Sequence, residues 1–236
     1  MTQDNATVAR EFPQERFRLA PGATHVYLVR HGESEPLRHD SPQPLVGGHG
    51  DPALATIGIA QARLVADRLS AIPLSAIYVS SLRRTAQTAA PLAQHTGLTP
   101  IIEPDLREVF LGDWEGGIYR IRAAENHRDW QRLQEEQTWD VIPGAEQVAD
   151  LQFRVRAAIN RIADAHRGQR VAVFAHGGVI GAAAAIATGG RMFAFAGSDN
   201  TSVTQLVVDG DSWLLRRFND TNHLDADLDY SPEEGK

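Results

Sequence analysis

Two apolar runs in this sequence each end in a histidine followed by a glycine, and this repeated pattern constrains the fold more than any other feature. Residues 26–29 lead into Arg-His-Gly at 30–32, and residues 171–175 lead into His-Gly-Gly at 176–178. Short, β-branched apolar runs are typical of strands buried in a parallel sheet. Because open α/β sheets bind ligands at the carboxyl ends of their strands, both histidines are expected at one edge of one sheet. Arg-His-Gly alone would also fit an ordinary polar strand end, so the remaining sequence must decide between the two interpretations.

A third apolar run, residues 76–79, is followed by Ser-Ser-Leu-Arg-Arg at 80–84, which places a guanidinium group at the start of an expected helix. Helix N-termini attract anions through their free N–H groups and the helix dipole. With Arg30, His31 and His176 at the same edge, the sequence predicts a strongly positive pocket. Phosphate suits such a pocket, because arginine binds it through paired hydrogen bonds and is always charged.

The charge and composition of the chain restrict its partners. Its 236 residues fit one large domain or two small ones. The net charge of −7 argues against nucleic-acid and membrane partners, since both favour a basic face. Cysteine is absent, which excludes disulfide scaffolds and thiolate nucleophiles and suits a reducing cytoplasm. The polar N-terminus does not match a secretory signal and no run has the length of a membrane span, so we expect a cytoplasmic protein.

Strand and helix signals alternate along the chain, which predicts an α/β class with a mainly parallel sheet. The first two helices are expected to be capped by Thr56 and by Ser80-Ser81. The apolar face of the first is expected to consist of Ile57, Ala60, Leu64, Val65 and Leu69. The turn at 209–211, Asp-Gly-Asp, is a hairpin signal between the last two strands. Strands are expected near 24–30, 76–79, 101–102, 171–175, 203–208 and 213–218, and helices near 56–70, 82–97, 148–168 and 178–190.

The same patterns predict one folded domain with two loosely held ends. Residues 1–22 are polar and end in Pro-Gly, which is typical of a flexible N-terminal arm. Residues 23–224 would form the single domain, in which 117–142 make a helical excursion over the site. Residues 225–236 would form an acidic C-terminal tail. The stretch 34–52, rich in proline, glycine and histidine, is expected to be a long loop beside the site, with His49 the one further histidine to watch.

Several kinds of chemistry can be weighed from the residues alone. The sequence has no phosphate-binding Gly-x-x-x-x-Gly-Lys motif, no Gly-x-Gly-x-x-Gly, no His-Glu-x-x-His and no Gly-x-Ser-x-Gly. Two histidines and an acid could bind a metal ion, but adjacent arginines would repel a dication, so we expect no metal and no other cofactor. A histidine nucleophile fits better, because neutral imidazole can attack phosphorus while a cationic pocket offsets the phosphoryl charge.

Arg30-His31-Gly32-Glu33-Ser34 resembles the opening signature of the histidine phosphatase superfamily, in its phosphoglycerate-mutase-like branch. Further matches follow in the family's order over residues 24–224, and together they are far more specific than any one of them. They are Asp51-Pro52 with Thr56, Gly58, Gln61 and Ala62; Arg84, Gln87 and Thr88 within 80–89; Leu106-Arg107-Glu108 with 112–116; 143–146; 175–180; and 219–224.

This resemblance implies a three-layer α/β/α sandwich with a mainly parallel central sheet, and it implies a role for each matched residue. His31 would be the nucleophile that becomes phosphohistidine. Glu108 would be the general acid that protonates the leaving oxygen, which requires a raised pKa in a partly enclosed site. The groups that would hold the phosphoryl oxygens are Arg30, Arg84, His176 and Gly177.

Some positions depart from the family pattern or have rivals. The family often has asparagine six residues after the nucleophile, where this chain has Leu37, and we expect the neighbouring Arg38 to replace it as a phosphate ligand. Arg83 is expected to be exposed or salt-bridged, not a ligand. The rivals of Glu108 for the acid role are the nearby Glu103, Asp105 and Asp113.

The resemblance therefore implies a metal-independent phosphomonoesterase that hydrolyses a small phosphate ester and releases inorganic phosphate. The alternatives are a phosphoglycerate-type phosphomutase and a non-catalytic phosphate-binding module. A mutase must exclude water, and the family's mutases resemble one another in a longer insertion than 117–142 and in a longer tail. Substrate specificity would lie in 34–52 and 117–142, which no motif decodes. An apolar edge at Met192–Phe195 would allow a homodimer.

Overall fold

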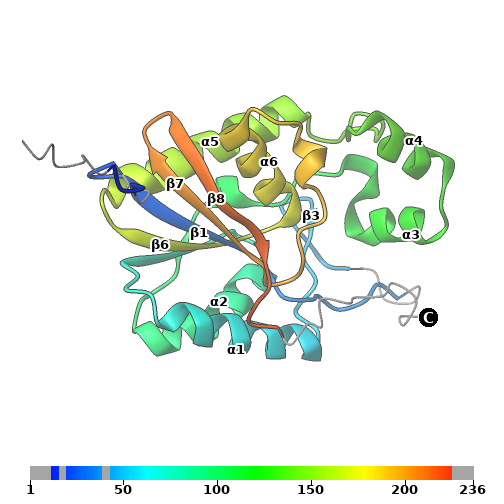
Figure 1. The fold of residues 1–236 in the computed structure, drawn as a ribbon. Helices are drawn as coiled ribbons and strands as arrows, with labels where there is room; N and C mark the ends of the chain where they lie inside the picture. Colours follow the sequence, from blue (N-terminus) through cyan, green and yellow to red (C-terminus); the bar gives the residue numbers. More distant parts are fainter. Residues whose placement is uncertain (1–11, 16–19, 39–42, 225–236) are drawn as a thin grey trace, which may run out of the picture.

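A computed structural model describes residues 12–15, 20–38 and 43–224 and contains one central six-stranded sheet in the order β5-β4-β6-β1-β7-β8 (Figure 1). The first four strands of this order are parallel, and β7 and β8 pair antiparallel through the hairpin that Asp-Gly-Asp predicted. The mainly parallel sheet is thus confirmed. The strands are β1 (Thr24–Arg30), β4 (Ala76–Val79), β5 (Ile101–Ile102), β6 (Arg170–Ala175), β7 (Val203–Asp209) and β8 (Ser212–Asp220).

Helices cover both faces of the sheet, so the expected three-layer sandwich is also confirmed. Figure 1 shows α1 (Thr56–Ser70) and α2 (Arg83–Thr96) below the sheet and α5 (Val148–Ala165) and α6 (Gly177–Thr188) above it. Parallel strands joined by helices must cross over the sheet, and alternating crossovers bury both of its faces. No helix in the described part of the chain is long and apolar enough to cross a membrane.

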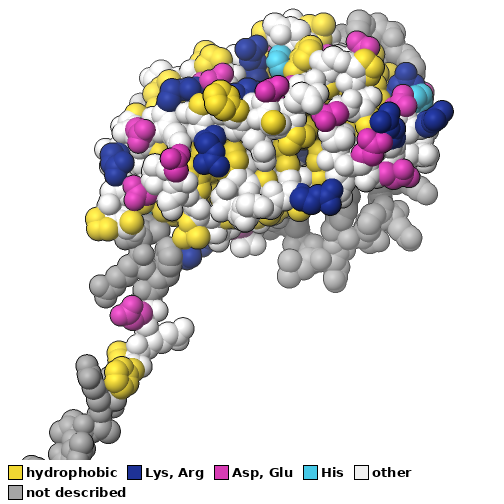
Figure 2. Space-filling view, turned by 90° about the horizontal axis from the view of Figure 1, so that it is seen from above, with side chains coloured by type: hydrophobic (Ala, Val, Ile, Leu, Met, Phe, Trp, Pro, Cys, Tyr) yellow, Lys and Arg dark blue, Asp and Glu magenta, His cyan; other side chains and the backbone are white. Residues whose placement is uncertain are grey.

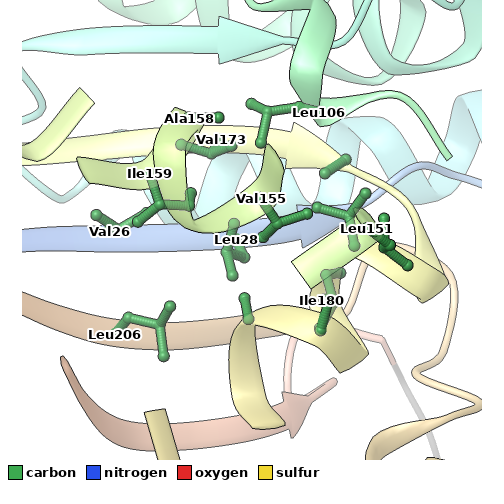
Figure 3. Close-up of a cluster of buried hydrophobic side chains, with 14 of the residues drawn as sticks. Val26, Leu28, Leu106, Leu151, Val155, Ala158, Ile159, Val173, Ile180 and Leu206 are labelled. Carbon is green, nitrogen blue, oxygen red and sulfur yellow. The ribbon is translucent and has the colours of Figure 1, made fainter. Parts of the chain in front are cut away.

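Each face of the sheet has its own hydrophobic cluster. Val26 and Leu28 of β1 point to the α5 side, where they meet Ile159 (Figure 3), and Val29 points to the α1 and α2 side. Strand side chains alternate between faces, so a strand buried on both faces must be apolar almost throughout. This requirement explains why residues 26–29 and 171–175 are uninterrupted apolar runs.

The first two helices begin close to where the sequence predicts, but their predicted side-chain caps are wrong. α1 begins at Thr56, its N-cap is Ala55, and no side chain caps it. α2 begins at Arg83 with Leu82 as its N-cap, and the hydroxyl of Ser80 accepts from the backbone N–H of Leu82 itself, at 3.2 Å. Side-chain capping was inferred from residue type alone, whereas packing of the chain entering each helix sets the actual boundary.

The apolar face expected for α1 is also partly wrong. Val65 and Leu69 are buried as expected. Ile57 and Leu64 are exposed, at 54% and 44%, while Gly58 and Ala62 face inward. A Cβ on Gly32 would lie 2.6 Å from the carbonyl oxygen of Gly58, so the backbone leaving β1 touches the first turn of α1. Glycine is needed at position 32 because a side chain would collide with the backbone of α1, and not because the chain makes a sharp turn there.

Two insertions stand at the edge where β1 and β6 end. The stretch 34–52, expected to be a loop, contains a small hairpin of β2 (Leu45–Val46) and β3 (His49–Gly50). The excursion at 117–142 forms α3 (Ile118–Ala124) and α4 (Arg128–Glu136), set apart from the other helices in Figure 1. Acidic and basic side chains are scattered among hydrophobic and other residues over the face seen in Figure 2. The expected N-terminal arm lies mostly, and the acidic tail wholly, outside the described residues.

Candidate active site

The register of the sheet brings the two predicted histidines together. Arg30 pairs with Ala175 across β1 and β6, so the next residues, His31 and His176, leave the sheet side by side. Their ring centroids are 5.2 Å apart. A cavity of about 430 Å³ opens at this point. Its walls include five of the predicted site residues: Arg30, His31, Arg84, Glu108 and Gly177.

The hydrogen bonding of His31 prepares one ring nitrogen for attack. Its Nδ1 lies 2.7 Å from the carbonyl oxygen of Gly32. A carbonyl oxygen can only accept, so Nδ1 carries the proton and Nε2 keeps a lone pair. Burial, together with the positive charges of Arg84 and Arg30, holds the pKa of His31 well below its usual value. The imidazole is therefore neutral at neutral pH.

His176 is positioned by a serine that the sequence indicated only as a helix cap. The hydroxyl of Ser80 lies 2.8 Å from Nε2 of His176, and both residues are buried. This contact follows from the register, because Val79 of β4 pairs with Phe174 of β6 and the following residues lie alongside. Burial and nearby Arg84 lower the pKa of His176 well below its usual value. Its Nδ1 is buried and has no partner among the described residues.

Two arginines supply positive charge without a neutralising carboxylate. Arg84 donates from Nη1 to the carbonyl oxygen of Gly50 at 2.9 Å, and Arg30 donates from Nη1 to the carbonyl oxygen of Ser198. Neither arginine takes part in an ion pair within the described residues. Burial is the main cause of the lowered pKa of both groups. Arg83 forms an ion pair with Asp51 at 2.9 Å, which confirms that it is a salt-bridged neighbour.

Glu108 places its carboxyl group over the first turn of α6. Its Oε1 accepts from the backbone N–H groups of Val109, at 2.9 Å, and Gly178, at 3.0 Å. Burial raises the pKa of Glu108, although the Val109 hydrogen bond and the arginines act in the opposite direction. A Cβ on Gly178 would lie 2.5 Å from Oε1, so glycine is needed there for the carboxyl group to fit.

The rival carboxylates are engaged elsewhere. Glu103 and Asp105 both pair with Arg161, at 3.0 and 2.6 Å. Asp113 is exposed and does not line the cavity. Glu115 lines it, but its two oxygens accept from the backbone N–H groups of Gly50 and Leu111. Glu108 is therefore the carboxyl group best placed to exchange a proton with a ligand.

Further cavity residues come from the excursion and were not identified in the sequence. Tyr119 of α3 packs against Trp114 and Trp130, and burial raises its pKa to about 12. Arg120 donates to the hydroxyl of Ser34 at 2.7 Å and to the backbone of Glu35 at 2.9 Å. These residues lie in 117–142, the region expected to govern specificity, but no local motif marks them.

Two expectations about the surroundings of the site are not supported. Arg38 is exposed and does not line the cavity, so the structure gives no contact by which it would replace the family's asparagine. Leu37 instead packs against Gly117, the N-cap of α3: a Cβ on Gly117 would lie 2.8 Å from the Leu37 side chain. The apolar edge at Met192–Phe195 is not an open surface either. Met192 is buried, Phe193 lies 4.7 Å from Trp139 between ring centroids, and Phe195 packs edge-to-face against Phe218.

Comparisons with known proteins find relatives over most of the chain. Phosphoglycerate mutase-like protein 4 of Arabidopsis thaliana is 34% identical over 206 residues, which cover 85% of this chain and 86% of that protein. The metal-independent phosphoserine phosphatase of the same plant is 28% identical over 225 residues, covering 92% and 90%. The solved structure of a mycobacterial glucosyl-3-phosphoglycerate phosphatase superposes with a TM-score of 0.69 at 27% identity, covering 84% of this chain and 100% of that one.

A family model matches most of the described sheet and the whole of the site. The match runs over residues 26–221, from the first apolar strand to the end of the last one. It therefore includes both strand-end histidines, both cavity arginines and the buried glutamate. The chain belongs to the histidine phosphatase superfamily, branch 1.

Proposed function

We propose that this chain is a phosphatase that hydrolyses a small phosphate monoester through a phosphohistidine formed on His31. The observation that carries the proposal is the state of that ring: Nδ1 is held as a donor to Gly32, and burial keeps the imidazole neutral. Such a histidine can attack phosphorus with Nε2. Arg30 and Arg84 offset the charge of the phosphoryl oxygens in the same cavity.

The proposed reaction has two steps that reuse one carboxyl group. In the first, the Nε2 lone pair of His31 forms a bond to phosphorus, the P–O bond of the ester breaks, and Glu108 donates its proton to the leaving oxygen. In the second, ionised Glu108 takes a proton from water as the water oxygen attacks phosphorus. The N–P bond breaks, inorganic phosphate forms, and both His31 and Glu108 return to their starting states.

The relatives favour hydrolysis over transfer to a second substrate. Two of the three proteins compared above are named as phosphatases, one for phosphoserine and one for glucosyl-3-phosphoglycerate. The excursion at 117–142 is also short, with only α3 and α4, which leaves little to shield a phosphohistidine from water. We propose a small phosphate ester as substrate, with inorganic phosphate as the product ligand.

The test is release of inorganic phosphate from 4-nitrophenyl phosphate and from a panel of metabolite phosphate esters, all in EDTA. We expect turnover with chelator present, a labelled phosphoenzyme after rapid acid-free quenching, and no turnover but retained phosphate binding in His31→Ala. Interconversion of phosphoglycerates without phosphate release would instead establish a mutase. Hydrolysis that survives in His31→Ala would show that the nucleophile is wrong.

A further inference from the structure

Buried polar atoms without a hydrogen-bond partner gather at the cavity. Among the described residues that line it, they include Nε of Arg30 and Oγ of Ser198. Buried polar atoms are normally paired in folded proteins, so a group of unpaired ones facing one cavity indicates where a polar ligand binds. Arg30 already has a role in the proposed reaction, whereas Ser198 has none.

Ser198 lies in the segment between the short helix η3 (Met192–Phe195) and β7, at the wall of the cavity. The residue is fully buried, and its backbone carbonyl accepts the hydrogen bond from Nη1 of Arg30. This contact fixes the position of the serine relative to the guanidinium group. The hydroxyl itself has no protein partner in the described residues.

The hydroxyl of Ser198 and the free nitrogen of Arg30 face the same small volume. A Cβ on Gly177 would lie 3.8 Å from Nε of Arg30 and 3.9 Å from Oγ of Ser198. Gly177 is the first residue of α6, directly after His176. Two donors therefore converge beside the helix N-terminus at which the second histidine stands, and a side chain at 177 would extend toward both of them.

We propose that the hydroxyl of Ser198 is a phosphoryl-oxygen ligand, an inference that rests on the phosphate site of the proposed function. The hydroxyl donates to the same phosphoryl group that Nε of Arg30 contacts, while the backbone carbonyl of Ser198 holds the other side of that guanidinium. It supplies a neutral donor that Leu37 cannot supply, because an aliphatic side chain has none.

The experiment measures binding of inorganic phosphate by calorimetry to the wild-type protein and to Ser198→Ala. Hydrogen bonds to charged groups contribute enough that removing one should weaken phosphate binding about tenfold or more. The matched control is Ser202→Ala, since Ser202 is equally buried and its hydroxyl is also unpaired, but it does not line the cavity. The control should bind phosphate like the wild type.

The outcomes separate this inference from the proposed function. Unchanged phosphate affinity in Ser198→Ala, with normal hydrolysis by the wild type, overturns the role of Ser198 and leaves the phosphatase proposal standing. If the wild-type protein neither binds phosphate nor hydrolyses any ester, the proposed function itself is overturned, and the role of Ser198 with it. Equal weakening in Ser198→Ala and Ser202→Ala would assign the effect to packing and also overturn the inference. If Ser198→Ala does not fold, Ser198→Gly removes the same hydroxyl with less side chain, and the same readouts apply.

Discussion

The chemistry of single residues in this protein is set by burial more than by residue type. Burial lowers the pKa of His31 and raises that of Glu108. Each shift favours the neutral form, as expected when a charge is withdrawn from water. The neutral imidazole is the nucleophilic form, and the neutral carboxyl group is the proton donor. One physical cause thus prepares both partners of the proposed first step.

Replacing Glu108 with glutamine should harm poor leaving groups most. A general acid typically contributes about 10²–10⁴-fold, and this contribution matters when the leaving oxygen is a strong base. We expect kcat/KM of Glu108→Gln to fall by that amount on an alkyl phosphate and far less on 4-nitrophenyl phosphate. Equal losses on both substrates, measured side by side, would contradict the acid role.

The pH profile on an alkyl phosphate should show two limbs with predictable signs. Protonation of His31 removes the nucleophile, so the acid limb of kcat/KM lies below the usual histidine pKa of 6.5. Ionisation of Glu108 removes the acid, so activity falls as pH rises through a value above the usual glutamate pKa of 4.5. The alkaline limb should disappear in Glu108→Gln. An alkaline limb that persists in this variant would belong to another group.

At the scale of elements, the site depends on close approach between segments that are distant in the sequence. The loop carrying Glu108 lies against the first turn of α6, and the chain leaving β1 lies against the first turn of α1. Both approaches occur at glycines, Gly178 and Gly32, where a side chain would collide with its neighbour. Interiors are close-packed, so a single added methyl group is felt.

The variant Gly178→Ala tests this packing. Its new Cβ would displace the carboxyl group of Glu108, which also loses the backbone N–H contact. We expect activity on alkyl phosphates to fall by about 10²-fold, as for a misplaced catalytic group. Calorimetry should show inorganic phosphate still bound, because Arg30 and Arg84 do not move. If Gly178→Ala keeps wild-type activity, the close contact between residue 178 and the carboxyl group of Glu108 is not needed for the reaction.

At the scale of the whole molecule, the positive charge of the cavity matters more for phosphate binding than the negative net charge of the chain. The chain carries −7 overall, which repels an anion at long range. The cavity nevertheless concentrates two unpaired arginines behind low-dielectric walls, where their attraction for phosphate is strongest. Because this cavity exists only in the folded protein, binding of phosphate should stabilise the folded state.

Inorganic phosphate should raise the melting temperature of the protein in EDTA. A ligand at 100 times its Kd stabilises the native state by about 2.7 kcal/mol, which corresponds to about 5–10 °C for a chain of this size. Differential scanning fluorimetry over a phosphate series, with chloride at matched ionic strength as control, measures the shift. The shift should be much smaller in Arg84→Gln; an equal shift in that variant would place phosphate elsewhere.

The sequence by itself determined the sheet class, the strands near 24–30, 76–79 and 171–175, and the set of strand-end histidines and arginines. These features are local, since a strand buried on both faces requires an uninterrupted apolar run and a site at its carboxyl end follows directly along the chain. The order of motifs was then enough to indicate the family. The structure differs where residue type alone was used. This applies to the side-chain caps of α1 and α2, to the apolar face of α1, and to the role of Arg38 as a phosphate ligand.

Only the tertiary structure decided which side chains meet. Ser80 and His176 are 96 residues apart, and the register of β4 and β6 brings them together. Ser198 reaches Arg30 from 168 residues away, and no local pattern distinguishes it from other serines. Tyr119 and Arg120 enter the cavity because α3 folds over it. Such contacts depend on the packing of whole elements, and packing is a property of many distant residues at once.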